Sequence, residues 1–128
     1  MALATAGVGL AMRDTGQTAL AREAERLAAL LEAGRAQSRA SGVAVRWRLT
    51  ENGFAFEGLP VDSLPTQWLV PGIQAQLATA DGRAAAALQL GPEPIIAAQQ
   101  VQLTRAEAPQ HSVRVASDGL RPFAAVTP

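Results

Sequence analysis

The residues whose chemistry could support catalysis or metal binding are few, and they stand far apart in the sequence. His111 is the single histidine, and the chain of 128 residues contains no cysteine. A catalytic histidine needs a partner that orients it, and a zinc site needs several nitrogen, sulfur or carboxylate ligands. The sequence therefore predicts that His111 is an ordinary surface or loop residue and that the protein holds no metal or cofactor.

The acidic residues are also scattered, and they do not form catalytic pairs. Glu23 and Glu25 are separated by one residue, so they point about 200° apart around a helix. Asn52, Asp81 and Asp118 each precede a glycine, which is typical of turns. The serines lack the Gly-x-Ser-x-Gly context that presents a nucleophile. We therefore expect a protein that is not an enzyme and has no catalytic residues.

Two aromatic residues near two arginines raise the alternative of nucleic-acid binding. Phe54 and Phe56 would lie on one face of a strand, with Arg46 and Arg48 close in sequence, and such groups can stack on bases. However, the chain has 11 basic and 11 acidic residues and therefore no net charge. No long-range field favours a nucleic acid. The preferred interpretation is that the aromatic rings belong to the core and that nucleic acid is not a partner.

The elements that must position these residues begin with a long amphipathic helix, expected over residues 16–41. Leu20, Ala24, Leu27, Leu31 and Gly34 recur at alternating spacings of four and three, which places them on one helix face. The three leucines are expected to pack in the core.

The ends of this helix and its one internal glycine carry further expectations. Asp14 or Thr15 could cap its start, and Gly42 could end it in a left-handed conformation. Gly34 lowers helix stability relative to alanine. It therefore marks either a tolerated substitution or a close approach of the helix to a sheet or a second helix.

The charged face of the helix is the candidate partner surface. Glu23 and Arg26 lie three positions apart, as do Glu32 and Arg35, and such pairs stabilise helices slightly. The basic side chains would otherwise remain free for acidic groups on a neighbouring protein, and Leu30 lies toward the margin of the apolar face. The candidate interface therefore contains Arg26, Leu30, Arg35 and Arg39.

After Gly42 the apolar pattern changes to the alternation of strands. Residues 43–58 are expected to form a β-hairpin, because Asn52-Gly53 is the dipeptide that favours a two-residue turn. The remaining strand signals cover residues 68–70, 73–79, 84–90, 95–103, 113–116 and 123–126, with a loop over 106–110. A helix followed by a run of strands predicts an α+β fold, in which one long helix packs on antiparallel sheets of six to eight short strands.

Residues 1–15 stand apart from the expected domain, which covers residues 16–128. Met1 to Met12 read MALATAGVGLAM, an apolar run of about 12 residues, which is shorter than the roughly 20 that a transmembrane helix needs. This segment is either the remnant of a longer apolar N-terminal helix or a disordered start.

Three motifs in this order resemble one family of proteins. They are the helix LAREAERLAALLEAGRAQSRASG, the hairpin VAVRWRLTENGFAFEGL and the final segment VRVASDGLRPFAAV, with LGPEPII as a connection in mid-domain. Together they are similar to minor pseudopilin H of bacterial type II secretion systems (GspH) and to the FimT and FimU minor pilins. The resemblance covers roughly residues 16–128.

The resemblance implies a pilin-like fold and a non-enzymatic structural role. Such subunits stack through their N-terminal helices into a periplasmic fibre, which is thought to push folded proteins through an outer-membrane channel. The implied partners are other major and minor pseudopilins near the fibre tip, and also exported proteins or the outer-membrane channel. The implied location is the periplasm, with the full-length form anchored in the inner membrane.

The chain departs from the family at its N-terminus. Family members begin with a cleaved leader, and their mature start, which is a site of methylation, opens a long apolar helix. Ala2 to Met12 would be the C-terminal half of that helix. Two alternatives remain open on the sequence alone: a minor pilin of a type IV pilus, and a monomeric periplasmic module that binds a ligand.

Overall fold

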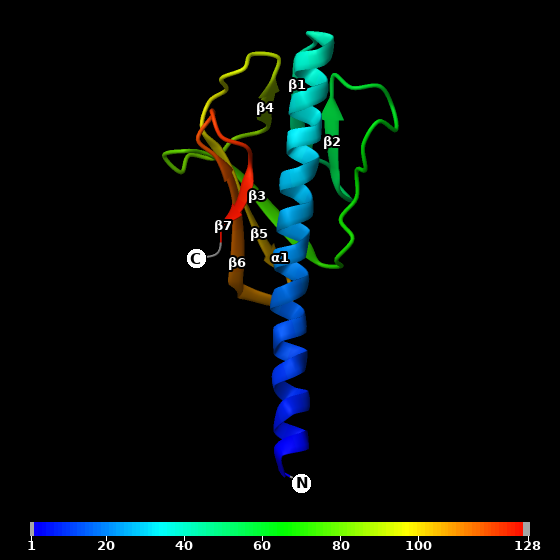
Figure 1. Cartoon of the computed structure of the whole chain (residues 1–128), viewed down its shortest axis with the longest axis vertical. Coiled ribbons are helices and arrows are strands. Elements are labelled where there is room, and N and C mark those ends of the chain that lie inside the picture. The colour runs from blue at the N-terminus through cyan, green and yellow to red at the C-terminus, as the bar shows by residue number, and fades with distance from the viewer. Residues whose placement is uncertain (1, 127–128) are drawn as a thin grey trace.

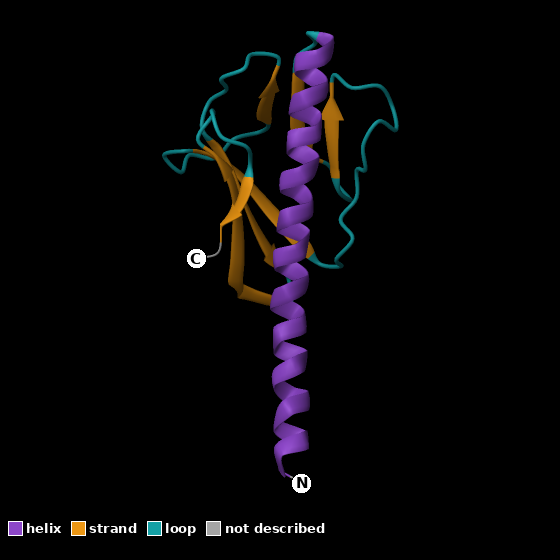
Figure 2. Ribbon diagram, in the orientation of Figure 1, coloured by secondary structure: helices purple, strands orange, loops and turns teal. Residues whose placement is uncertain are grey.

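The computed structural model describes the backbone of residues 2–126 and the side chains of residues 16–126. In this part of the chain, one long helix is followed by seven strands (Figure 1). The helix lies along two antiparallel sheets (Figure 2). The predicted α+β class, with a long helix on antiparallel sheets of six to eight strands, is confirmed.

The two sheets share no strand. The first has the order β2-β1-β4, and the second has the order β3-β5-β6-β7. The bounds of the first sheet are β1 (Val45–Leu49), β2 (Phe54–Glu57) and β4 (Leu88–Gly91). Those of the second are β3 (Ile73–Thr79), β5 (Gln99–Arg105), β6 (Ala108–Ser117) and β7 (Ala124–Val126). Because β3 belongs to the second sheet and β4 to the first, the described chain crosses between the sheets three times.

Helix α1 (Ala2–Ser41) has 40 residues and starts earlier than the expected range of 16–41. Asp14 and Thr15 lie inside it, so the prediction that they cap its start is wrong, and their side chains lie outside the described residues. The expectation that residues 1–15 are separate from the domain also falls on residues whose side chains the structure does not describe. In the described residues, α1 is not apolar enough over a sufficient length to cross a membrane. At the other end, Gly42 has a φ of 73° and donates its N–H to Ser38 at 2.8 Å, as predicted.

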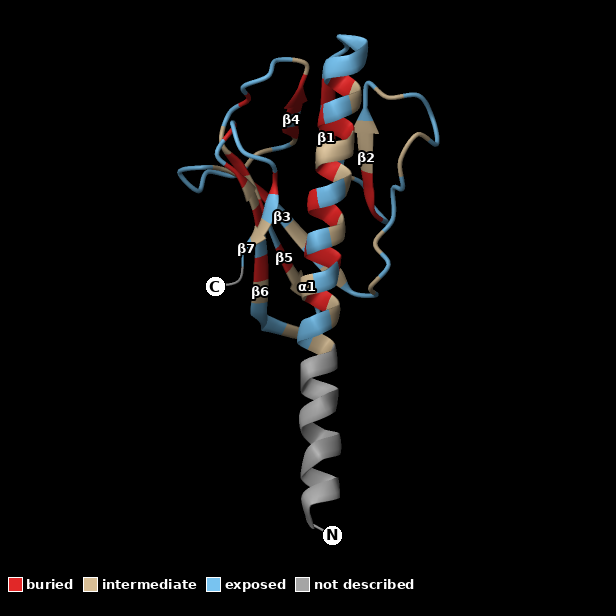
Figure 3. Cartoon of the chain, in the orientation of Figure 1, coloured by how far each residue is buried: buried red, intermediate tan, exposed pale blue. Residues whose placement is uncertain are grey.

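The core lies between the inner face of α1 and both sheets (Figure 3). From the helix it receives Leu20, Ala24, Leu27, Ala28 and Leu31, all buried. Apolar side chains that alternate along β1, β5 and β6 complete it, which is the pattern of sheets covered on one face.

An aromatic cluster fills the space between the first sheet and the long loop that follows it. Trp68 lies in this loop, and its ring is 4.7 Å from Phe54 and 6.3 Å from Trp47. The prediction of a short strand at residues 68–70 is therefore wrong. Trp68 attaches the loop by edge-to-face packing, which adds to the stabilisation from buried area.

The hairpin of β1 and β2 is confirmed, but its turn differs from the predicted one. The pairing of Leu49 with Phe54 leaves four residues in the loop. Gly53 does not take a positive φ, so the two-residue turn typical of Asn-Gly is absent from this hairpin. A glycine is required at position 53 for a different reason. A Cβ there would lie 2.2 Å from the carbonyl oxygen of Thr66, which is too close.

Several strand boundaries also differ from expectation. The strand expected over residues 95–103 begins only at Gln99, the first residue of β5. Of the predicted strand 84–90, only its end belongs to β4, because Ala85 crosses the edge of β3 and donates its N–H to Leu77 at 3.0 Å. The predicted loop 106–110 is mostly strand, since β6 begins at Ala108 beside an irregularity in its pairing with β5. Runs of alanine and the polar Pro109-Gln110 pair carry no alternation that could reveal either boundary.

Candidate assembly surface

Helix α1 has one face that neither sheet covers. Its exposed residues lie opposite the buried leucines and recur at spacings of three, four or seven, so they lie along one side of the helix as a stripe that half-buried residues interrupt between Ala29 and Ala36 (Figure 3). The stripe changes character along the helix, from polar and charged to small and apolar. It consists of Thr18, Arg22, Glu25, Ala29, Ala36 and Ala40, and Arg39 lies beside it.

The residues that the sequence assigned to the helix interior and to its surface fall into three groups. Leu20, Leu27 and Leu31 are at most 3% exposed and lie in the core. Leu30 is half-buried and packs against the edge of the core. Arg39 is exposed.

Arg26 is half-buried because it ties the loop before β3 to the helix. Its Nη1 donates to Glu23 Oε1 at 2.7 Å, and its Nη2 donates to the carbonyl oxygen of Gln67 at 3.2 Å. The same carboxylate oxygen accepts the backbone N–H of Leu69 at 3.2 Å. Glu23 is 3% exposed, so this pair acts inside the fold and anchors residues 67–69.

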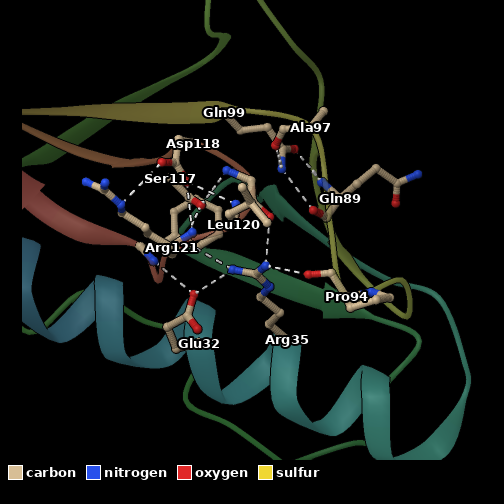
Figure 4. A network of polar contacts seen from close by, with 12 residues as sticks. Glu32, Arg35, Gln89, Pro94, Ala97, Gln99, Ser117, Asp118, Leu120 and Arg121 are labelled. Atoms are coloured by element: carbon tan, nitrogen blue, oxygen red, sulfur yellow. Dashed lines mark hydrogen bonds and ion pairs between the residues drawn. The ribbon is translucent and has the colours of Figure 1, made fainter.

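Arg35 is buried, which corrects the expectation that it is available to a partner. Its guanidinium donates to the carbonyl oxygens of Gly119 at 2.9 Å, Pro94 at 3.0 Å and Arg121 at 3.3 Å (Figure 4). Glu32, 3.5 Å away, accepts the N–H of Phe123 at 2.9 Å. The two helix residues therefore hold together segments from three parts of the chain.

The turn that Arg35 holds is also stabilised by its own side chains. Ser117 donates its hydroxyl to the carbonyl oxygen of Arg121 at 2.7 Å and accepts the N–H of Gly119 at 3.0 Å. Asp118 accepts the N–H groups of Leu120 and Arg121 at 2.9 and 2.8 Å. These backbone hydrogen bonds lower the pKa of the Asp118 carboxyl from its usual value.

A glutamine joins the two sheets next to this turn. The amide of Gln99, at the start of β5, accepts the N–H of Gln89 at 2.6 Å and donates to its carbonyl oxygen at 2.9 Å (Figure 4). Its side chain therefore occupies the place of a neighbouring strand beside β4. The same amide donates to the carbonyl oxygen of Ala97 at 3.0 Å, so the link joins β4 to the segment that enters β5.

The anchored loops present large apolar side chains to solvent. Leu120 is 67% exposed and Ile95 is 63% exposed, and the N–H of Ile96 donates to Gly119 at 3.1 Å. Leu69, beside the other anchor, is 71% exposed. None of these three residues was predicted as a surface feature from the sequence. Leu120 follows a turn, and Leu69 follows a proline-rich stretch. An apolar residue that stands in such a segment, outside any strand pattern, is the sequence signal that could have revealed an exposed apolar side chain.

The described residues contain no group of three or more side chains that could hold a metal ion. His111 is exposed and lies 3.2 Å from the amide of Gln17, which joins the start of β6 to the helix. Asp81 and Asp118 both lie in turns that continue into glycine, as predicted.

The sequence matches no protein-family model and no curated protein. Among solved structures, the minor pseudopilin EpsH of the type 2 secretion system of Vibrio cholerae is similar, with a TM-score of 0.64 and 15% identity. That match covers 85% of this chain and 98% of EpsH. The type IV minor pilin FimU of Pseudomonas aeruginosa is also similar, with a TM-score of 0.61 and 12% identity over 89% of this chain and 91% of FimU.

These two structures share with this chain one N-terminal helix packed on antiparallel sheets. The resemblance noted in the sequence motifs is thus confirmed at the level of the fold. The chain has the pilin-like α+β fold of a minor pseudopilin and a type IV minor pilin.

Proposed function

We propose that this protein is a structural subunit, a minor pseudopilin of a type II secretion pseudopilus, that assembles near the fibre tip with other pilin-like subunits. In this role it has no catalytic activity and contributes to the export of folded proteins across the outer membrane. The proposed location is the periplasm, with the full-length form anchored in the inner membrane. The fold that the chain shares with EpsH supports this assignment.

The observation that carries the proposal is the uncovered face of α1. A helix of 40 residues is about 60 Å long, and in the described part its outer stripe is open. Ala29, Ala36 and Ala40 are small, so a second helix can approach this stripe closely, within the usual distance of about 8–10 Å between packed helix axes. A subunit that stacks on copies of a related fold needs such a face in addition to its core face.

The proposed interface combines this stripe with the loops beside it. Arg22 and Arg39 are exposed and can pair with acidic groups on a neighbour. Leu30 lies at the margin of the stripe, and Leu69 offers apolar area on one side. Single exposed ion pairs contribute about 0–1 kcal/mol, so the apolar contacts and the helix packing would supply most of the affinity.

The test is to measure binding to the major and minor pseudopilins encoded in the same operon. We expect Ala36→Glu to weaken binding, because a longer charged side chain blocks the close approach of a second helix. Ala124→Glu is the matched control, since Ala124 is exposed on β7 and lies off the helix. Calorimetry and thermal denaturation would show that both variants remain folded.

The outcome distinguishes the proposal from its alternatives. Equal binding by both variants would contradict the interface, and the absence of any pilin-like partner would favour a monomeric periplasmic module. The likeness to FimU supports a second candidate, a minor pilin of a type IV pilus. Binding to type IV pilins, with none to pseudopilins, would select that role.

A further inference from the structure

Strand β3 is an edge of the second sheet, and part of its backbone has no partner. The N–H of Thr79 donates to Arg83 at 2.8 Å, and the carbonyl oxygen of Leu77 accepts the N–H of Ala85 at 3.0 Å. These bonds lie on the side away from β5. Because backbone groups alternate sides along an antiparallel strand, those of Ala75 and Ile73 point the same way. In the described chain no segment pairs with this end of β3.

A cavity of about 600 Å³ lies against this open edge. Such a volume falls within the usual range of about 300–1,000 Å³ for ligand sites. Leu49, at the end of β1, forms one wall, and the alanines that cross from β3 to β4 form another. The lining consists of Leu49, Ala75, Gln76, Leu77, Ala78, Gly82, Ala84, Ala85, Ala86, Gln100 and Gln102.

The lining of this cavity contains no charged residue among the residues described. Three glutamines line it, and an amide can both donate and accept a hydrogen bond; that of Gln100 already donates to the carbonyl oxygen of Thr79 at 3.0 Å. Small alanines leave room beside the strand. The lining itself offers an ionic group no partner of opposite charge. The site therefore favours a ligand that is uncharged and polar and that both donates and accepts along its length, which are the properties of an extended peptide backbone.

We propose that this cavity binds an uncharged, extended segment of another protein, which adds as a strand to the free edge of β3 at Ile73–Ala75. The backbone of Ala75 would exchange hydrogen bonds with the incoming strand. One side chain of that strand would enter the space beside Leu49 and Ala85. This mode of recognition uses main-chain bonds for affinity and a pocket for specificity.

A narrow occupant fits better than the flank of a second folded domain. The crossing at residues 83–85 already covers β3 at Leu77 and Thr79, so only a short stretch of its edge is open. The glutamines lie on the sheet face opposite the buried Leu77, Val101 and Leu103, which pack on the core beneath α1. Binding here is thus independent of the helix stripe in the proposed function, and both surfaces could be occupied at once.

The experiment uses a blocked octapeptide of alternating valine and threonine as the probe, added at millimolar concentration to the isotopically labelled chain. We expect chemical-shift changes at residues 73–77 and 84–86 and slower hydrogen exchange of the Ala75 amide. A peptide of the same length with proline at every position cannot donate a backbone hydrogen bond and should produce neither effect. Maltose serves as an uncharged polar ligand without a peptide backbone.

Two variants test the site from within the chain. Ala75→Pro removes the outward donor without removing a bond to β5, and proline is tolerated on an edge strand. It should weaken peptide binding by about fivefold to tenfold, as expected for one lost backbone hydrogen bond. Gln102→Glu places a charge in the lining and should weaken binding by roughly fivefold or more.

Gln89→Glu is the matched control, because Gln89 is exposed on β4 and lies outside the cavity. It should bind the peptide as the parent chain does. The proposal is overturned if the peptide causes no change at residues 73–77, if the proline peptide or maltose causes the same change, or if Gln102→Glu binds like Gln89→Glu. None of these results bears on binding through the stripe of α1.

Discussion

The guanidinium of Arg35 donates a hydrogen bond of 2.9 Å to the carbonyl oxygen of Gly119, 84 residues further along the chain. The helix and the last turn of the domain are thereby joined by a buried charge. The same guanidinium also donates hydrogen bonds to the carbonyl oxygens of Pro94 and Arg121. Its planar shape holds the N–H donors in a fixed arrangement that matches these acceptors.

Replacing Arg35 with methionine should destabilise the fold, because three carbonyl oxygens lose their donor. Hydrogen bonds from a charged group contribute about 1.5–3 kcal/mol, and we expect a loss of that order in the free energy of unfolding. Urea denaturation measures it. Arg39→Met is the control, since an exposed substitution should stay within about 0.5 kcal/mol. Equal midpoints for the two variants would contradict the anchoring role.

Glu23→Gln should release the loop around Leu69 while leaving most of the helix intact. The variant keeps the shape of the side chain but loses the charge that Arg26 and the N–H of Leu69 share. The amide of Leu69 should therefore exchange hydrogen faster. Native-state exchange detects this change, and Glu25→Gln, exposed two positions along the helix, should leave the rate unchanged.

Gly34 marks a close approach between α1 and the first sheet. A Cβ at this position would lie 3.0 Å from Leu90 Cδ1 and from two ring carbons of Phe56. Gly34→Leu should therefore lower the free energy of unfolding by about 1–3 kcal/mol through overpacking. Ala36→Leu, on the exposed stripe, should leave it nearly unchanged. Thermal denaturation of both variants measures the difference. A Gly34→Leu protein as stable as Ala36→Leu would show that the first sheet shifts to accommodate the larger side chain without loss of stability.

The turn at Asp118 should contribute to the pH dependence of stability. Its pKa lies below the ordinary value of 3.8 because Arg121 and Leu120 donate backbone hydrogen bonds to the carboxylate. A depressed pKa adds stability above pH 3.8 that is lost as the pH falls through the lower folded pKa. The difference in unfolding midpoint between the parent chain and Asp118→Ala should thus be constant near neutral pH and narrow in acid. A difference in unfolding midpoint that stays the same from neutral to acidic pH would contradict this mechanism.

Local patterns in the sequence were sufficient to predict the elements that depend on neighbouring residues. The spacing of Leu20, Leu27 and Leu31 indicated the buried face of α1, and the alternation from Val45 to Leu49 indicated the strand that the structure contains. Gly42 ends the helix as expected because a left-handed residue is a local requirement. These features need no knowledge of distant segments.

The features that sequence reasoning missed depend on distant parts of the chain. Arg35 was predicted at the surface because it is charged. It follows Leu31 by four positions, however, and the loops at Pro94 and Gly119 supply the acceptors that make its burial favourable. The cavity beside β3 was also missed, since it forms where Leu49 meets a crossing segment of alanines. Neither arrangement has a signature in a short window of sequence.

The distant partners of α1 also bear on how the chain is made. Synthesis delivers the helix well before Gly119 and Phe123, which lie 84 and 91 residues after the Arg35 and Glu32 that hold them. At about 5–20 residues per second, the interval is on the order of ten seconds. During that time the guanidinium of Arg35, which is buried in the finished fold, lacks its acceptors at Gly119 and Arg121. A nascent chain halted before residue 119 should therefore leave the end of α1 around Arg35 more accessible to chaperones and proteases, and addition of the segment from Gly119 to Phe123 would complete its protection.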